Sequence, residues 1–203
     1  MKSFNDNNKR NVSLLLAHIL SPGVEVLSNN MKRITDALLW SATTDRDDVD
    51  SHKYRLPIWT PRAVEFRNEW LRNGRKGLRH EHMYPRNLLR QKLDLLASHG
   101  NATPDTIYDL LLKFSHAAIV HPDEAALLNR SRLARDLPHP YRKNEDADPV
   151  ELLFSRYIHL KIDLKFIDFC GDELIDNNIY YLKNGDLNLD LICELDFEGW
   201  DGR

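Results

Sequence analysis

The chain has 203 residues and a net charge of −3, with 42% hydrophobic and 29% charged residues. This composition is typical of a compact globular protein, and the length excludes two full-sized enzymatic domains. The longest apolar runs fall far short of the roughly 20 residues that a membrane helix needs, and no signal-peptide pattern opens the chain, so we expect a cytoplasmic protein without a membrane partner.

Helical spacing of apolar residues recurs along the first two thirds of the chain. It predicts helices at residues 11–20, 29–42, 61–73, 86–98, 104–114 and 122–137. Two of them have clear start signals, because Thr60-Pro61 and Thr103-Pro104 each place a capping hydroxyl before a proline at the first helical position.

Two short segments bounded by turn residues predict strands, at residues 79–84 and 116–121. Each is followed by a predicted helix, so the extended-then-helix arrangement occurs twice. If the two strands pair, the cluster at residues 80–82 lies close to the polar residues of the second unit, which are His116, His121 and Glu124.

A Pro-rich, charged linker at residues 138–149 is the expected boundary between two parts of the chain. We predict a mainly helical domain at residues 1–140 and an acidic α/β segment at residues 141–203. In that segment Asn184-Gly185 suits the positive φ values of a tight hairpin turn. The fold class is therefore α+β: a mainly helical body with two short strands, followed by a small β-containing C-terminal segment.

Charge is distributed unevenly along the chain. Residues 53–92 contain eleven basic and three acidic side chains, a balance of +8, whereas residues 144–203 contain fifteen acidic and five basic ones, a balance of −10. The basic stretch is the electrostatic footprint that nucleic-acid phosphates bind, and the acidic segment suits either this stretch or a basic protein partner. The alternative for both is ordinary solvated charge.

Single positions exclude several chemical motifs. In the stretch RHEHMYPRN, residues 79–87, a helix-borne zinc protease needs a histidine where Tyr84 stands. The zinc deaminase pattern needs a cysteine pair, whereas Cys170 and Cys193 each lie among apolar residues that predict buried free thiols. The chain also has no Gly-rich phosphate loop and no G-x-S-x-G elbow.

What remains is Glu81-His82-x-x-Pro85, which resembles the Asp/Glu-His-x-x-Pro start of the HNH, or ββα-metal, nucleases. The resemblance implies that Glu81 binds Mg²⁺ or Mn²⁺ and that His82 is the general base for the attacking water. A nearby arginine, Arg86, completes the expected catalytic group. The candidate metal ligands are Glu81, His116, His121 and Glu124.

The expected function is a metal-dependent nuclease or nuclease-like nucleic-acid-binding protein that binds DNA or RNA through residues 53–92. Conflict between bacteria and their viruses would suit such a nuclease. One alternative is a metal-independent ribonuclease, because Arg75-x4-His80 is similar to the catalytic motif of HEPN ribonucleases. Another is a non-enzymatic interaction or inhibitor module with opposed basic and acidic surfaces. In that case the histidines are structural, and Glu81 pairs with Arg79 or Arg86.

Overall fold

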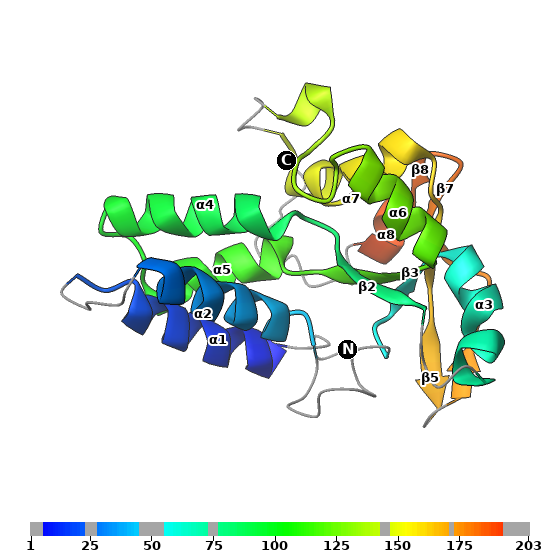
Figure 1. The fold of residues 1–203 in the computed structure, drawn as a ribbon, viewed down its shortest axis with the longest axis horizontal. Helices are drawn as coiled ribbons and strands as arrows, with labels where there is room; N and C mark the ends of the chain where they lie inside the picture. The colour runs from blue at the N-terminus through cyan, green and yellow to red at the C-terminus, as the bar shows by residue number, and fades with distance from the viewer. Residues whose placement is uncertain are drawn as a thin grey trace.

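The structure of the chain, a computed structural model, describes residues 6–22, 28–44, 55–72, 77–142, 147–170 and 173–192 (Figure 1). Its helices are α1 (Asp6–Ile19), α2 (Ser28–Ser41), α3 (Pro61–Arg72), α4 (Arg86–Ser98), α5 (Pro104–Phe114), α6 (Pro122–Arg130), α7 (Pro149–Leu160) and α8 (Leu189–Ile192), with a 3-10 turn at His139–Tyr141. Its strands are β1 (Ile58–Trp59), β2 (Arg79–His82), β3 (Ala117–Val120), β4 (Leu164–Phe166), β5 (Asp168–Cys170), β6 (Glu173–Ile175), β7 (Tyr180–Lys183) and β8 (Asp186–Leu187). The chain is an α+β protein, as its sequence predicts.

The molecule has a helical half and a half that contains the sheet (Figure 1). Helices α1, α2, α4 and α5 lie together in the first half, and α3, α6 and α7 lie around the sheet in the second. The main sheet has the strand order β2-β3-β1-β4-β7-β8, and β5 and β6 form a separate two-stranded sheet. Among the described strands of the main sheet, only β1 and β3 pair in parallel. Because β4, β7 and β8 follow residue 141, both expected segments of the chain contribute strands to one sheet.

Helix starts follow the sequence signals closely. The Thr60 hydroxyl accepts a hydrogen bond from the Ala63 N–H (3.2 Å) at the start of α3. The Thr103 hydroxyl accepts one from the Thr106 N–H (3.2 Å) at the start of α5. These contacts satisfy N–H groups that have no partner inside a first helical turn, so both caps are confirmed.

Helix α6 is shorter than the apolar spacing predicts. It ends at Arg130, although the predicted helix extends to residue 137. The reason is Arg132, whose φ of 60° lies in the left-handed region that terminates a right-handed helix. Residues 131–136 form turns instead.

The two predicted strands pair with each other. β2 and β3 run antiparallel, with Glu81 opposite Ala118 and His82 opposite Ala117. β1 was not predicted: it has two residues between prolines, too few to show an alternating pattern. It nevertheless lies at the centre of the sheet, and the Trp59 side chain is fully buried there.

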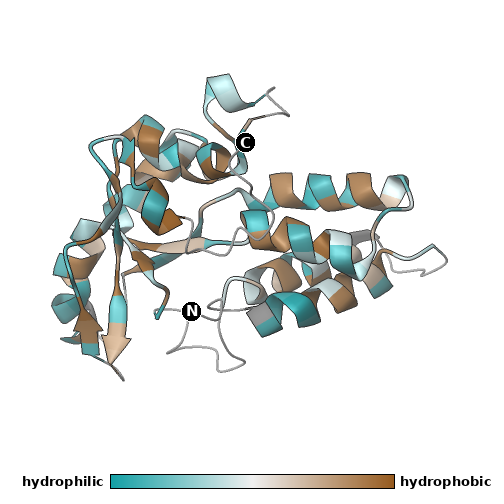
Figure 2. Cartoon of the chain, turned by 180° about the vertical axis from the view of Figure 1, so that it is seen from behind, coloured by the Kyte–Doolittle hydropathy of each residue, from teal (hydrophilic) through white to brown (hydrophobic). Residues whose placement is uncertain are grey.

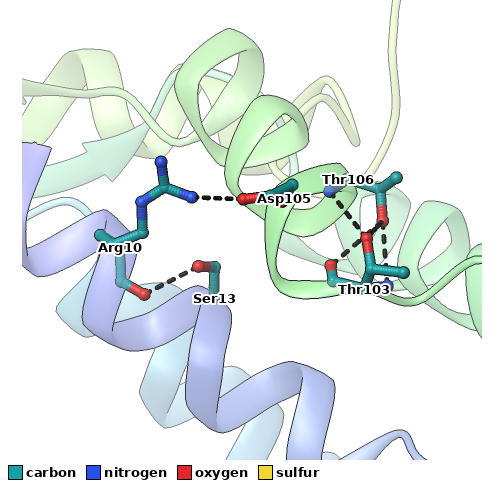
Figure 3. Close-up of polar contacts among 5 residues, drawn as sticks. All are labelled: Arg10, Ser13, Thr103, Asp105 and Thr106. Carbon is teal, nitrogen blue, oxygen red and sulfur yellow. Dashed lines mark hydrogen bonds and ion pairs between the residues drawn. The ribbon is translucent and has the colours of Figure 1, made fainter.

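The helical half is fastened by contacts between α1 and α5, which Figure 3 shows. In Figure 3 the Arg10 guanidinium donates to the Asp105 carboxylate (2.7 Å) in the first turn of α5. The same guanidinium lies over the Tyr108 ring, 3.9 Å from its centroid. Because this ion pair is exposed, it contributes at most about 1 kcal/mol. The larger contribution comes from buried apolar side chains such as Leu16 and Leu111 in the core beneath it.

Apolar side chains from both halves form the core. In Figure 2 brown and teal residues alternate along the helices, as amphipathic helices require. The main cluster contains residues of α1, α2, α4, α5, α6 and α7 together with strand residues, and a smaller cluster surrounds Trp59. No helix within the described ranges is long and apolar enough to cross a membrane.

The prediction of buried thiols is wrong for Cys170. This residue is exposed at the end of β5, because the two-stranded sheet that it belongs to pairs only with itself. Cys193, the other cysteine of this prediction, lies outside the described residues.

The hairpin β7–β8 confirms the turn signal and supports a stability prediction. Asn184 and Gly185 have φ values of 55° and 93°, as a two-residue turn of this kind requires. We expect Gly185→Ala to lower the free energy of unfolding by about 1 kcal/mol, because a Cβ is strained at this φ. Urea unfolding measures the change, and Asn184→Gly, which fits the same turn, is the control. An unchanged midpoint in Gly185→Ala would contradict the prediction.

Candidate functional site

The His-Glu-His cluster forms β2, an edge strand of the main sheet. The strand follows Gly77, whose φ of 116° and close approach to the Phe66 ring leave no room for a side chain. It ends before Pro85, which precedes α4. Side chains alternate between the two faces of a strand, so the two histidines lie on one face and Glu81 lies on the other.

Glu81 is bound by an arginine from α7. The Arg156 Nη2 donates to Glu81 Oε1 at 2.6 Å, and its Nη1 donates to the His82 carbonyl at 2.7 Å. The Arg156 side chain is 0% exposed and that of Glu81 is 21% exposed. A buried guanidinium requires a counter-charge, so the negative charge of Glu81 is neutralised inside the fold. Neither arginine expected from the sequence, Arg79 or Arg86, has this role.

Glu124 is also held by hydrogen bonds inside the fold. It accepts hydrogen bonds from the Thr60 hydroxyl (2.5 Å) and from the His121 N–H (2.9 Å), and it is buried. His121 in turn caps α6, since its Nδ1 accepts from the Asp123 N–H at 3.3 Å. The two residues therefore fix the start of α6 next to the start of α3.

Tyr157 lies between these two acidic residues. Burial raises the pKa of its hydroxyl above the ordinary value of 10, with Arg156, Glu81 and Glu124 as the charged neighbours. Its oxygen has no hydrogen-bond partner among the described residues. Three polar or charged side chains, those of Arg156, Tyr157 and Glu124, are therefore buried near Glu81.

The histidine face of β2 packs against α2. The Trp40 ring contacts the rings of His80 and His82 edge-on, with centroids 4.2 and 5.7 Å apart, and the two imidazoles lie 5.4 Å from each other. The Thr43 hydroxyl lies 3.3 Å from His80 Nε2. These contacts join the helical half of the molecule to the sheet edge.

His82 is neutral at physiological pH. Burial lowers the pKa of its imidazole well below 6.5, and the adjacent His80, Arg86 and Arg156 lower it further. Its Nε2 is buried and has no hydrogen-bond partner among the residues that the structure describes. Of the three residues expected to be catalytic, His82 and Arg86 are therefore neighbours, whereas Glu81 is on the other face.

His116 lies directly before β3, next to the end of β2 at His82. Its ring Nε2 donates to the Leu112 carbonyl at 2.7 Å, and its own carbonyl accepts from the Met83 N–H at 2.9 Å. Burial lowers the pKa of the His116 imidazole to about 3, and the nearby Lys9 acts in the same direction. The ring is thus turned toward the helical half of the molecule.

The structure does not bring the four candidate metal ligands together. His116 and His121 flank β3 at opposite ends, roughly 16 Å apart for five residues of extended chain. Glu81 is bound to Arg156, and Glu124 is bound to Thr60 and the α6 backbone. Within the described ranges no three His, Cys, Asp or Glu residues form a group that suits a metal ion. The candidate ligands therefore do not converge in this structure, and the Mg²⁺ or Mn²⁺ cofactor stays a prediction.

The basic stretch supplies surface charge on three consecutive elements. Arg62 and Arg72 of α3 and Arg79 of β2 are exposed, and Arg86, Arg90 and Lys92 of α4 are half-buried. Arg62 and Arg90 pair with Asp123 (2.8 Å) and Asp36 (3.1 Å). The Arg79 side chain has no hydrogen bond or ion pair with any described residue. Arg75, the arginine of the expected HEPN-like pair, lies outside the described residues.

The residues that hold the cluster, above all Arg156 and Trp40, were not predicted from the sequence. Arg156 did leave a signal: it is the single strongly basic side chain inside the helical run VELLFSRYIHL, which is otherwise mainly apolar. A charge at such a position requires a buried partner, but the sequence does not say which one. Trp40 left no signal beyond its place on an amphipathic helix.

The chain was compared with protein-family models, with curated proteins and with solved structures, and none of the three comparisons gives a match. Residue roles therefore rest on the contacts described above.

Proposed function

We propose that the chain is a nuclease-like nucleic-acid-binding protein that holds the phosphate backbone without a metal-dependent cleavage step. The observation that carries this proposal is the ion pair between Arg156 and Glu81, 2.6 Å long with a fully buried guanidinium. It uses the carboxylate that a metal ion would need. In this proposal Glu81 of the HNH-like motif anchors strand β2 to Arg156 and binds no metal ion. The surrounding arginines bind the phosphate backbone.

The charge of residues 53–92 supports binding. The stretch carries a balance of +8, and the Arg156 guanidinium from outside it compensates Glu81, one of its three acidic side chains. Arg72 and Arg79 are exposed, and neither has an ion pair with another described residue. Guanidinium groups bind phosphate oxygens in a bidentate way, which makes them suited to a nucleic-acid backbone.

A second candidate is metal-free cleavage of RNA at the histidine pair. It is favoured by the neutral imidazole of His82, which lies next to His80 and Arg86. A neutral imidazole can accept the proton of a ribose 2′-hydroxyl, and a guanidinium can stabilise the phosphate. Because His82 is buried, this chemistry requires the contact between α2 and β2 to open.

Binding is tested with labelled single-stranded RNA and DNA over a series of salt concentrations. We expect the wild type to bind both, with an affinity that falls as salt rises. The double variant Arg72→Ala/Arg79→Ala should reduce the slope of log affinity against log salt by about 1.4, because each lost phosphate contact in a single strand removes about 0.7. Arg10→Ala, which removes an exposed arginine of α1, is the control. Absence of binding at low salt would contradict the proposal.

Cleavage is tested on the same RNA and DNA with Mg²⁺, with Mn²⁺ and with a chelator. The main proposal predicts intact substrate in all three conditions. RNA cleavage that survives the chelator and is lost in a folded His82→Gln variant would favour the second candidate. Cleavage that depends on the metal would overturn both and restore the metal-dependent nuclease.

A further inference from the structure

Three exposed arginines lie at the end of α6 and in the turn that follows it, and none of them has a counter-charge among the described residues. Arg130, Arg132 and Arg135 are exposed, and their side chains have no hydrogen bond or ion pair with any described residue. The acidic side chain of this segment, Asp136, is already used: it pairs with Arg142 at 2.9 Å and accepts from the Leu137 N–H at 2.9 Å. A local excess of positive charge therefore faces solvent.

The backbone of this turn is fixed by the fold. The Leu133 side chain, between the arginines, is 3% exposed and belongs to the main apolar cluster. The Ala134 N–H donates to the Leu128 carbonyl at 3.2 Å, and the Arg135 N–H donates to the Arg132 carbonyl at 3.2 Å. An anchored turn presents its arginines with little loss of backbone freedom on binding.

Two features argue against a purely structural reason for the three charges. A helix C-terminus favours cations only within its last turn, which accounts for Arg130 but not for Arg132 and Arg135. Arg132 also has a φ of 60°, where glycine is free of the strain that a Cβ brings. No hydrogen bond or ion pair with a described residue accounts for the arginine side chain at this position.

We propose that this turn is a phosphate-binding site for a nucleic-acid backbone, separate in sequence from the basic stretch at residues 53–92. The inference rests on the proposed function and adds a second contact to it. Guanidinium groups two and three residues apart on a fixed turn match a ligand with repeated phosphates, because each can donate hydrogen bonds to two oxygens of one phosphate group. A single-stranded RNA or DNA is the class of ligand that supplies such repeats.

The test compares two triple variants that each remove three positive charges. The turn variant is Arg130→Gln/Arg132→Gln/Arg135→Gln, and the control is Arg10→Gln/Lys32→Gln/Arg33→Gln on the exposed surfaces of α1 and α2. With a labelled 30-nucleotide single strand as the probe, we expect the turn variant to bind about tenfold more weakly and to lose about 2 units of salt slope, which corresponds to three contacts of about 0.7 each. The control should lose less than half of that.

Equal losses in the two variants would overturn the inference, because they would reflect net charge alone. The inference would also be overturned if the turn variant binds the strand as tightly as the wild type while Arg72→Ala/Arg79→Ala binds more weakly. That result would leave the proposed function standing. A wild type that does not bind the strand at low salt would remove the proposed function and the inference together. Thermal unfolding of each variant, with a midpoint that matches the wild type, verifies that the variant is folded.

Discussion

Replacement of Arg156 by methionine is expected to lower the free energy of unfolding by about 3 kcal/mol, as the loss of one partner of a buried ion pair does. The variant leaves the half-buried Glu81 carboxylate without its counter-charge and the His82 carbonyl without its donor. Methionine fills most of the volume, so the loss reports the polar contacts more than a cavity. Urea unfolding, monitored by far-UV circular dichroism, gives the free energy.

A double-mutant cycle with Glu81→Gln separates the ion pair from other effects of the change. We expect Arg156→Met/Glu81→Gln to be more stable than Arg156→Met, because the second change removes the stranded carboxylate charge, whereas Glu81→Gln alone should destabilise the wild type. Arg142→Met is the matched control, since the Arg142–Asp136 pair is exposed and should contribute less than about 1 kcal/mol. A loss below about 1 kcal/mol in Arg156→Met would show that the pair does not hold β2 to α7.

Acid is expected to destabilise the chain well above the range in which carboxylates titrate. The pKa of His116 is lowered to about 3 and that of His82 is lowered well below 6.5, both first by burial. Unfolding restores the ordinary value near 6.5, so the unfolded chain takes up protons that the native chain does not. The stability from these residues is present above pH 6.5 and is lost as the pH falls toward 3. At pH 5 the loss from His116 alone is about 2 kcal/mol.

The pH dependence is measured by urea unfolding between pH 7.5 and pH 5. His116→Gln keeps a donor for the Leu112 carbonyl and cannot titrate, so we expect a flatter profile in this variant. His99→Gln, at an exposed residue after α4, is the control and should keep the wild-type slope. The prediction fails if wild type and His116→Gln lose the same free energy between these pH values.

Most helices of the fold could be predicted from the sequence, because a helix is a local structure with a local period. The bounds of α4 agree with the predicted 86–98 to the residue. α6 was predicted too long, since the backbone angle of Arg132 is not visible in apolar spacing. β1 was missed because a two-residue strand owes its existence to its neighbours β3 and β4 and has no pattern of its own.

The residue types of the candidate site identified its place in the sequence, but they did not identify the residues that contact it. The tripeptide at residues 80–82 was recognised and both strands were predicted, but their pairing was left open and is shown only by the structure. Arg156, however, lies 75 residues from Glu81, and Trp40 lies on a helix far from either in sequence. The ion pair of Glu81 and the neutral form of His82 depend on these contacts. Sequence spacing therefore identified the side chains and left their chemistry open.

The hydrogen bond from Arg156 to the His82 carbonyl has a consequence for behaviour at high concentration. β2 is one of the two outer strands of the main sheet, and an outer strand offers unpaired backbone groups that strands of other molecules can join. The guanidinium occupies one of these acceptors, 2.7 Å away, and brings a charge to the border of the sheet. Its loss would open the strand to intermolecular pairing. A variant without Arg156 should therefore precipitate as fibrous or amorphous aggregates at concentrations at which the wild type stays monodisperse.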